Sequence, residues 1–144
     1  MFLPPSKQYL FLVKTDDNGN LQWSKTINTG SYPSAIYQTP NQGYVILGSQ
    51  TYDGQNPTMY EIIKINAKGD VGWHKKYGGT GNQYTAQSSS GLKVDDGYII
   101  AGSASAKGES ATGWIVKTGF DGNMMWDKTC SYNGFPSNIE SISQ

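Results

Sequence analysis

The chain has 144 residues, and its 11 lysines and arginines balance its 11 aspartates and glutamates, so its formal net charge is zero. This balance gives no electrostatic reason to expect a nucleic-acid partner or binding to an anionic membrane. A single cysteine, Cys130, excludes an internal disulfide and a zinc site built from several cysteines. No apolar stretch approaches the ~20 residues of a membrane-spanning helix. Abundant glycine, aromatic residues and few charges predict an all-β protein with many tight turns.

Short apolar runs, each separated from the next by turn residues, predict a series of β-hairpins. In chain order these hairpins span residues 11–25, 35–49, 61–75, 91–103 and 114–128. No segment has the i, i+3, i+4 apolar spacing of an amphipathic helix. The whole chain is therefore expected to consist of antiparallel strands.

Three of these hairpins repeat the same residues at the same spacing. A lysine recurs at 14, 64 and 117, a turn glycine at 19, 69 and 122, and a tryptophan at 23, 73 and 126, so every series has spacings of 50 and 53. We expect each turn glycine to adopt a positive φ, as in a bulged hairpin loop. With the second hairpin of each unit, the repeat amounts to four short strands in about 50 residues, which is typical of a propeller blade.

The repeat predicts a single domain over residues 1–144, a propeller-type array of three four-stranded blades. The expected units are residues 1–33, 34–83 and 84–136, and residues 137–144 are expected to form the first strand of a further or swapped blade. Residues 2–6 match residues 99–103, the second strand of a unit. Closed propellers use about 4–8 blades, so three predict part of a six-bladed or larger ring. Either two chains complete the ring as a homodimer, or a longer chain supplies the missing blades.

The quoted strands, the D-x-x-G-N-x-x-W pattern of residues 16–23 and the following lysine resemble a family of β-propeller repeats. The family occurs in secreted and surface proteins of bacteria and archaea and is similar in form to kelch and PQQ-type blades. The resemblance implies an extracellular or cell-surface location and a role in binding, adhesion or scaffolding. It carries no catalytic motif. The expected function is therefore a non-catalytic binding or scaffold module for a protein or carbohydrate ligand. A propeller lectin and a fragment of a larger propeller enzyme are the alternatives.

Residues with catalytic or metal-binding chemistry are sparse. His74 lies where the other units carry Ser24 and Asp127, and an exposed strand residue explains it best. The acidic turn at residues 16–20 lacks the alternating ligands and the downstream glutamate of a calcium loop, so turn formation explains its residues. We expect no enzyme activity, cofactor or metal. The repeated tryptophans are expected to fill the gap between neighbouring sheets.

The connections between units are the expected binding region, because they run from the outer strand of one blade to the inner strand of the next. Aromatic residues with neighbouring amides and hydroxyls suit a carbohydrate or peptide. Packing between blades is the alternative explanation for these rings. The predicted aromatic rim comprises Tyr32, Tyr84, Tyr132 and Phe135.

Overall fold

The computed structural model describes residues 9–50, 58–78, 84–106, 109–131, 133 and 135–143. Within these ranges the chain forms ten β-strands and no helix, as predicted, and therefore no helix that could cross a membrane. The first six strands are β1 (Leu10–Thr15), β2 (Leu21–Ile27), β3 (Ser31–Gln38), β4 (Tyr44–Gln50), β5 (Met59–Ile65) and β6 (Val71–Tyr77). The last four are β7 (Tyr84–Val94), β8 (Gly97–Ala106), β9 (Thr112–Gly119) and β10 (Met124–Cys130).

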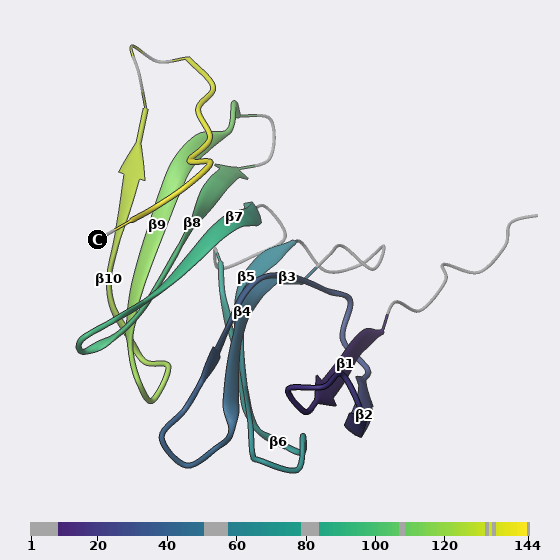
Figure 1. The fold of residues 1–144 in the computed structure, drawn as a ribbon. Coiled ribbons are helices and arrows are strands. Elements are labelled where there is room, and N and C mark those ends of the chain that lie inside the picture. Colours follow the sequence, from purple (N-terminus) through teal and green to yellow (C-terminus); the bar gives the residue numbers. More distant parts are fainter. Residues whose placement is uncertain are drawn as a thin grey trace, which may run out of the picture.

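The strands form three antiparallel sheets of two, four and four strands, ordered β1-β2, β3-β4-β5-β6 and β7-β8-β9-β10. The two larger sheets pack face to face through β7, and the β1–β2 pair lies against the other face of the middle sheet (Figure 1). Two of the three predicted four-stranded units are thus present. The first unit shows two strands, since the strand expected over residues 2–6 lies outside the described part of the chain. The structure shows no closed ring.

The three repeated turns have the backbone that the sequence predicts. Gly19, Gly69 and Gly122 have φ values of 82°, 82° and 76°. The strand register shifts beside each turn, at Lys14/Thr15, Lys64/Ile65 and Met124/Trp126, which confirms the bulged hairpin. In the first two turns an Asx side chain closes the loop, because the Oδ1 atoms of Asp16 and Asn66 each accept two backbone N–H groups.

The main core lies between the two four-stranded sheets. Tyr60 on β5 stacks on Trp114 of β9 with ring centroids 4.7 Å apart, and its hydroxyl donates a 3.0 Å hydrogen bond to the Trp114 carbonyl. Gly91 lets β7 approach β4 closely, since a Cβ there would lie 2.9 Å from the Leu47 Cβ. A second cluster joins the β1–β2 pair to the middle sheet and contains Leu10, Ile46, Ile63 and Ile65.

The C-terminal segment runs across the far face of the third sheet instead of joining a sheet (Figure 1). The Ile139 amide donates to the Gly102 carbonyl at 3.2 Å, and the Ile142 amide donates to Ser90 Oγ at 3.3 Å. The Ser137 amide donates to the Ala111 carbonyl at 2.9 Å, as the Ala86 amide of β7 does to Thr58 at 2.7 Å. Residues 136–143 therefore do not form the strand that was expected over residues 137–144. Their first hydrogen bond to the third sheet nevertheless corresponds to the one that β7 makes to the middle sheet.

Candidate functional site

The predicted aromatic rim is only partly visible in the structure. Tyr32 lies in β3 and is 51% exposed, and Phe135 follows β10 and is 66% exposed. Tyr84 begins β7, but its side chain lies outside the described residues, as does the whole of Tyr132. The structure therefore places one exposed ring near the start of β3 and one after β10, and it leaves a common rim as a prediction.

Tyr84 lies close to, but not at, the position of the third sheet that corresponds to Tyr32. Tyr32 pairs with Ser49, whereas the residue that pairs with the corresponding Ser103 is Gln87. Gly48 and Gly102 agree with this register: a Cβ on the first would lie 2.3 Å from the Tyr32 carbonyl oxygen, and a Cβ on the second 2.1 Å from that of Gln87. Tyr84 pairs with Ala106, three residues further along, because β7 has 11 residues and β3 has 8.

An apolar groove of about 290 Å³ lies beside β1, over β3 and β4 of the middle sheet. Its lining residues are Leu12, Val13, Lys14, Thr15, Trp23, Ile36, Gln38, Tyr44 and Ile65. The groove exists because β1 and β2 cover only part of the middle sheet, which leaves Ile36 on β3 55% exposed. Sequence reasoning missed this site, since its walls come from strands about 20 to 50 residues apart whose packing no local pattern reveals.

The groove has an aromatic floor with one positive charge. Trp23 and Tyr44 meet edge to face, with ring centroids 6.3 Å apart. Lys14 Nζ lies 5.9 Å from the centroid of the Tyr44 ring, within reach of a cation–π contact. A surface of this kind suits apolar or aromatic side chains better than a highly charged ligand.

His74 makes a contact that the sequence did not predict. Its Nε2 lies 2.7 Å from Glu61 Oε2, and the side chains of His74 and Glu61 are 26% and 2% exposed. Thr29 also donates to Glu61, at 3.4 Å. The neighbouring sheet carries a hydrogen-bonded pair at the corresponding positions, Trp114 Nε1 to Asp127 Oδ2 at 2.9 Å. The third sheet has a tryptophan where the middle sheet has Glu61, yet in both sheets the two side chains link adjacent strands. The His74–Glu61 contact is therefore interpreted as a link between β5 and β6.

The acidic turns are explained by their own hydrogen bonds. The side-chain and backbone hydrogen bonds from Asn20 hold the pKa of Asp16 below its usual range. Among the described residues no group of three or more histidine, cysteine, aspartate or glutamate side chains could hold a metal ion. The hydrogen bonds that the Asp16 and Asn66 side chains accept from the backbone show that the turn residues shape the hairpin.

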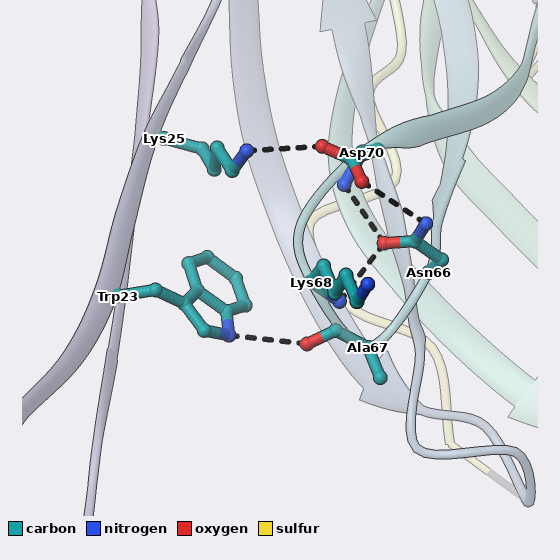
Figure 2. A network of polar contacts seen from close by, with 6 residues as sticks. All are labelled: Trp23, Lys25, Asn66, Ala67, Lys68 and Asp70. Atoms are coloured by element: carbon teal, nitrogen blue, oxygen red, sulfur yellow. Dashed lines mark hydrogen bonds and ion pairs between the residues drawn. The ribbon is translucent and has the colours of Figure 1, made fainter.

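Tryptophan and lysine side chains of one sheet hold the hairpin turn of the next, and we call each Trp–Lys pair a clamp (Figure 2). In the first clamp, Trp23 Nε1 donates to the Ala67 carbonyl at 3.1 Å, and Lys25 Nζ forms a 2.9 Å ion pair with Asp70. The Trp23 ring lies against Gly69, where an added Cβ would be 3.2 Å from ring atom Cζ3. The expectation that this tryptophan fills the gap between sheets is confirmed, and Lys25 adds an ion pair across the same gap.

The second clamp joins the middle sheet to the third through the corresponding tryptophan and lysine, Trp73 and Lys75. Lys75 Nζ donates to Asn123 Oδ1 at 2.6 Å. An added Cβ on Gly122 would lie 2.7 Å from Cη2 of Trp73, so only glycine fits under this ring. Asp70 and Asn123 both directly follow the turn glycine, which shows that the lysine recognises an oxygen at that position.

No protein-family model matches this chain, and no curated protein matches it either. The relationship to kelch and PQQ-type repeats therefore stays a prediction from the residue pattern.

Proposed function

We propose that this protein is a non-catalytic binding or scaffold module of the propeller type, and that its groove accepts an extended segment of a partner protein. The observation that carries the proposal is the edge of β1. Within the described residues β1 pairs only with β2, so its other edge faces the groove with unpaired backbone groups. An exposed strand edge beside an apolar trough is the arrangement used for strand addition.

The middle sheet supports this choice of occupant. Its β5, like β1, leads into a glycine turn and a tryptophan-bearing strand, and β4 pairs along the whole of β5. The alternate β4 residues Val45 and Leu47 are fully buried, at 0% exposure, in the core shared with the third sheet. A strand added to β1 would take the place that β4 takes on β5. Its alternate apolar side chains would enter the groove over Ile36 and Tyr44.

The test uses a peptide with the sequence of β4, residues 44–50, flanked by lysines for solubility, and a scrambled peptide as its control. We expect saturable binding in calorimetry, with slower hydrogen exchange of β1 amides, since strand addition protects the paired edge. Ile36→Asp should weaken binding by about tenfold or more, because it places a charge in the apolar groove. Val71→Asp is the matched control, as Val71 is 47% exposed on β6 and does not line the groove.

Two results would contradict the proposal. One is equal weakening by Ile36→Asp and Val71→Asp, which would place the peptide elsewhere. The other is binding that appears only after deletion of residues 1–8, which would make the chain's own N-terminal segment the occupant. The location outside the cell and membership of a propeller ring remain parts of the proposal that rest on the sequence resemblance.

Carbohydrate binding is the second candidate, and the exposed rings of Tyr32 and Phe135 favour it. Flat aromatic faces beside amide and hydroxyl groups suit the apolar faces of sugars. A sugar-dependent rise in Tm that is lost in Phe135→Ala would support this alternative, and no response across common sugars would oppose it.

A further inference from the structure

One outer surface of the molecule carries a third Trp–Lys pair, and the opposite outer surface carries a hairpin turn of the kind that the clamps hold. On β10, Trp126 and Lys128 repeat the clamp residues, and Trp126 is 41% exposed. In the described part of the chain no turn packs on them. At the opposite surface, the turn at residues 16–20 is met by no clamp among those residues, and a Cβ on Gly19 would have nothing within 4 Å.

The free turn already has the shape that the clamps hold. Gly19 donates to the Asp16 carbonyl at 3.0 Å, as Gly69 does to Asn66 and Gly122 to Gly119, also at 3.0 Å. Gly19 and Gly69 share a φ of 82°. Binding would therefore require little rearrangement of the turn, which keeps its entropic cost low.

The polar groups also match. Asn20 follows Gly19 as Asn123 follows Gly122, and Asn123 is the residue whose Oδ1 accepts the hydrogen bond from Lys75. Asn20 donates through its Nδ2 to Asp16, which leaves its Oδ1 suited to accept from a lysine. Lys128 holds the place of Lys75, two residues beyond the tryptophan.

The strand beside the free turn has an apolar face that corresponds to buried faces in the other sheets. Phe11 and Val13 are 63% and 53% exposed. Val13 directly precedes Lys14. In the other two sheets the corresponding residues are Ile63 and Val116, and both are fully buried, at 0% exposure. This face is therefore of the kind that a preceding sheet covers inside the molecule.

We propose that the third clamp closes between two copies of this chain. Trp126 and Lys128 of one copy hold the turn at residues 16–20 of a second copy, and the third sheet of the first copy covers Phe11 and Val13 of the second. The contact is head-to-tail, so it generates a ring if the rotation closes and a filament if it does not. Of its residues Val13 also lines the groove, whereas the turn at residues 16–20, Trp126 and Lys128 lie outside it, so the contact does not depend on the proposed peptide binding.

Sedimentation velocity on the full chain over a range of concentrations tests the proposal. We expect reversible association that Trp126→Ala and Gly19→Ala each weaken by about tenfold or more, since both act at the centre of the contact. Lys128→Ala should weaken it less. Lys76→Ala removes an exposed charge from β6 outside both surfaces and is the control for charge. Ile36→Asp, in the groove, should leave association unchanged, and circular dichroism should show that every variant is folded.

Disulfide trapping identifies the two surfaces directly. In a Cys130→Ser background, copies carrying only Asn20→Cys are mixed with copies carrying only Lys128→Cys. We expect the mixture to form a mixed disulfide faster than either variant forms its own. A chain that stays monomeric at about 1 mM, where even weak contacts are populated, would overturn the proposal. Association that Trp126→Ala and Gly19→Ala both leave intact would overturn it too.

Discussion

The turns at residues 16–20 and 66–70 have the same backbone and opposite surroundings. Both glycines have a φ of 82°, and in each turn the first residue closes the loop with its Oδ1 atom. Gly69 lies under the Trp23 ring, whereas Gly19 has open space where a side chain would begin. The comparison shows that the turn forms from its own residues. The neighbouring sheet decides whether it also becomes a contact between sheets.

The tryptophans that can pack on these turns differ in the same way, since one of them contacts a turn and the other is exposed. Trp23 is half-buried and bonded to the Ala67 carbonyl, while Trp126 is exposed on β10. Their strands carry the same Trp-x-Lys pattern. A repeated residue therefore has a role in stability only where the next sheet supplies a turn.

The largest expected difference between two matched variants comes from removing each tryptophan in turn. Trp23→Ala should lower the free energy of unfolding by about 2–3 kcal/mol, because a half-buried ring leaves a gap between two sheets. Trp126→Ala should change it by less than about 0.5 kcal/mol, the usual range for an exposed site. Urea unfolding at a concentration where the chain is monomeric measures both. Equal losses would mean that the ring acts within its own sheet and would break the comparison.

The turn glycines give a second, smaller contrast. Gly19→Ala should cost about 1–2 kcal/mol, the penalty of a left-handed backbone for an alanine. Gly69→Ala carries the same penalty and adds about 1–3 kcal/mol, because its Cβ would lie 2.7 Å from the Lys25 Cγ and 3.2 Å from the Trp23 ring. The excess at Gly69, measured by urea unfolding, is the contribution of close packing under the clamp. If the two alanine variants are equally unstable, the Trp23 and Lys25 side chains can move aside to admit the Gly69→Ala methyl group, and they do not hold the turn tightly.

These contrasts indicate what the sequence can and cannot predict. The bulged turns were predictable because Asp16, Asn66 and the glycines act over five residues. The strands and the gap-filling place of Trp23 followed from repeated spacing. The salt bridge between Lys25 and Asp70 was less predictable, since it joins residues 45 positions apart across two sheets.

The candidate site was much less predictable than the strands. The exact place of Tyr84 was not predictable, because the residue that corresponds to Tyr32 is Gln87, and the connection that leads to it from Trp73 is longer than the one from Trp23 to Tyr32. The groove depends on how far β1 overlaps β3, and Ile36 looks like any other core residue in the sequence. An edge strand without a pairing partner is the one signal that could have indicated the groove.

The last and smallest expected effect separates Asp70 from Asp16 by titration. A hydrogen bond from Lys25, with further help from Asn66, lowers the pKa of Asp70 below 3.8. The pKa of Asp16 is lowered by Asn20, within its own turn. A carboxyl with a depressed pKa in the folded state stabilises the fold above its unfolded pKa, and this contribution is lost as the pH falls through the folded pKa.

Lys25→Met should therefore raise the pKa of Asp70 toward 3.8 and leave that of Asp16 unchanged, as measured by NMR titration of the carboxyl carbons. The same variant should lose less stability on acidification below about pH 4, because one of the carboxylates that favour the folded state has lost its partner. Added salt should raise the pKa of Asp70 more than that of Asp16, since an exposed ion pair is screened whereas a hydrogen bond from an amide is not. A parallel shift of both aspartates in Lys25→Met would show that the two turns are coupled through the sheets, and the free turn could not then serve as an independent reference for the clamped one.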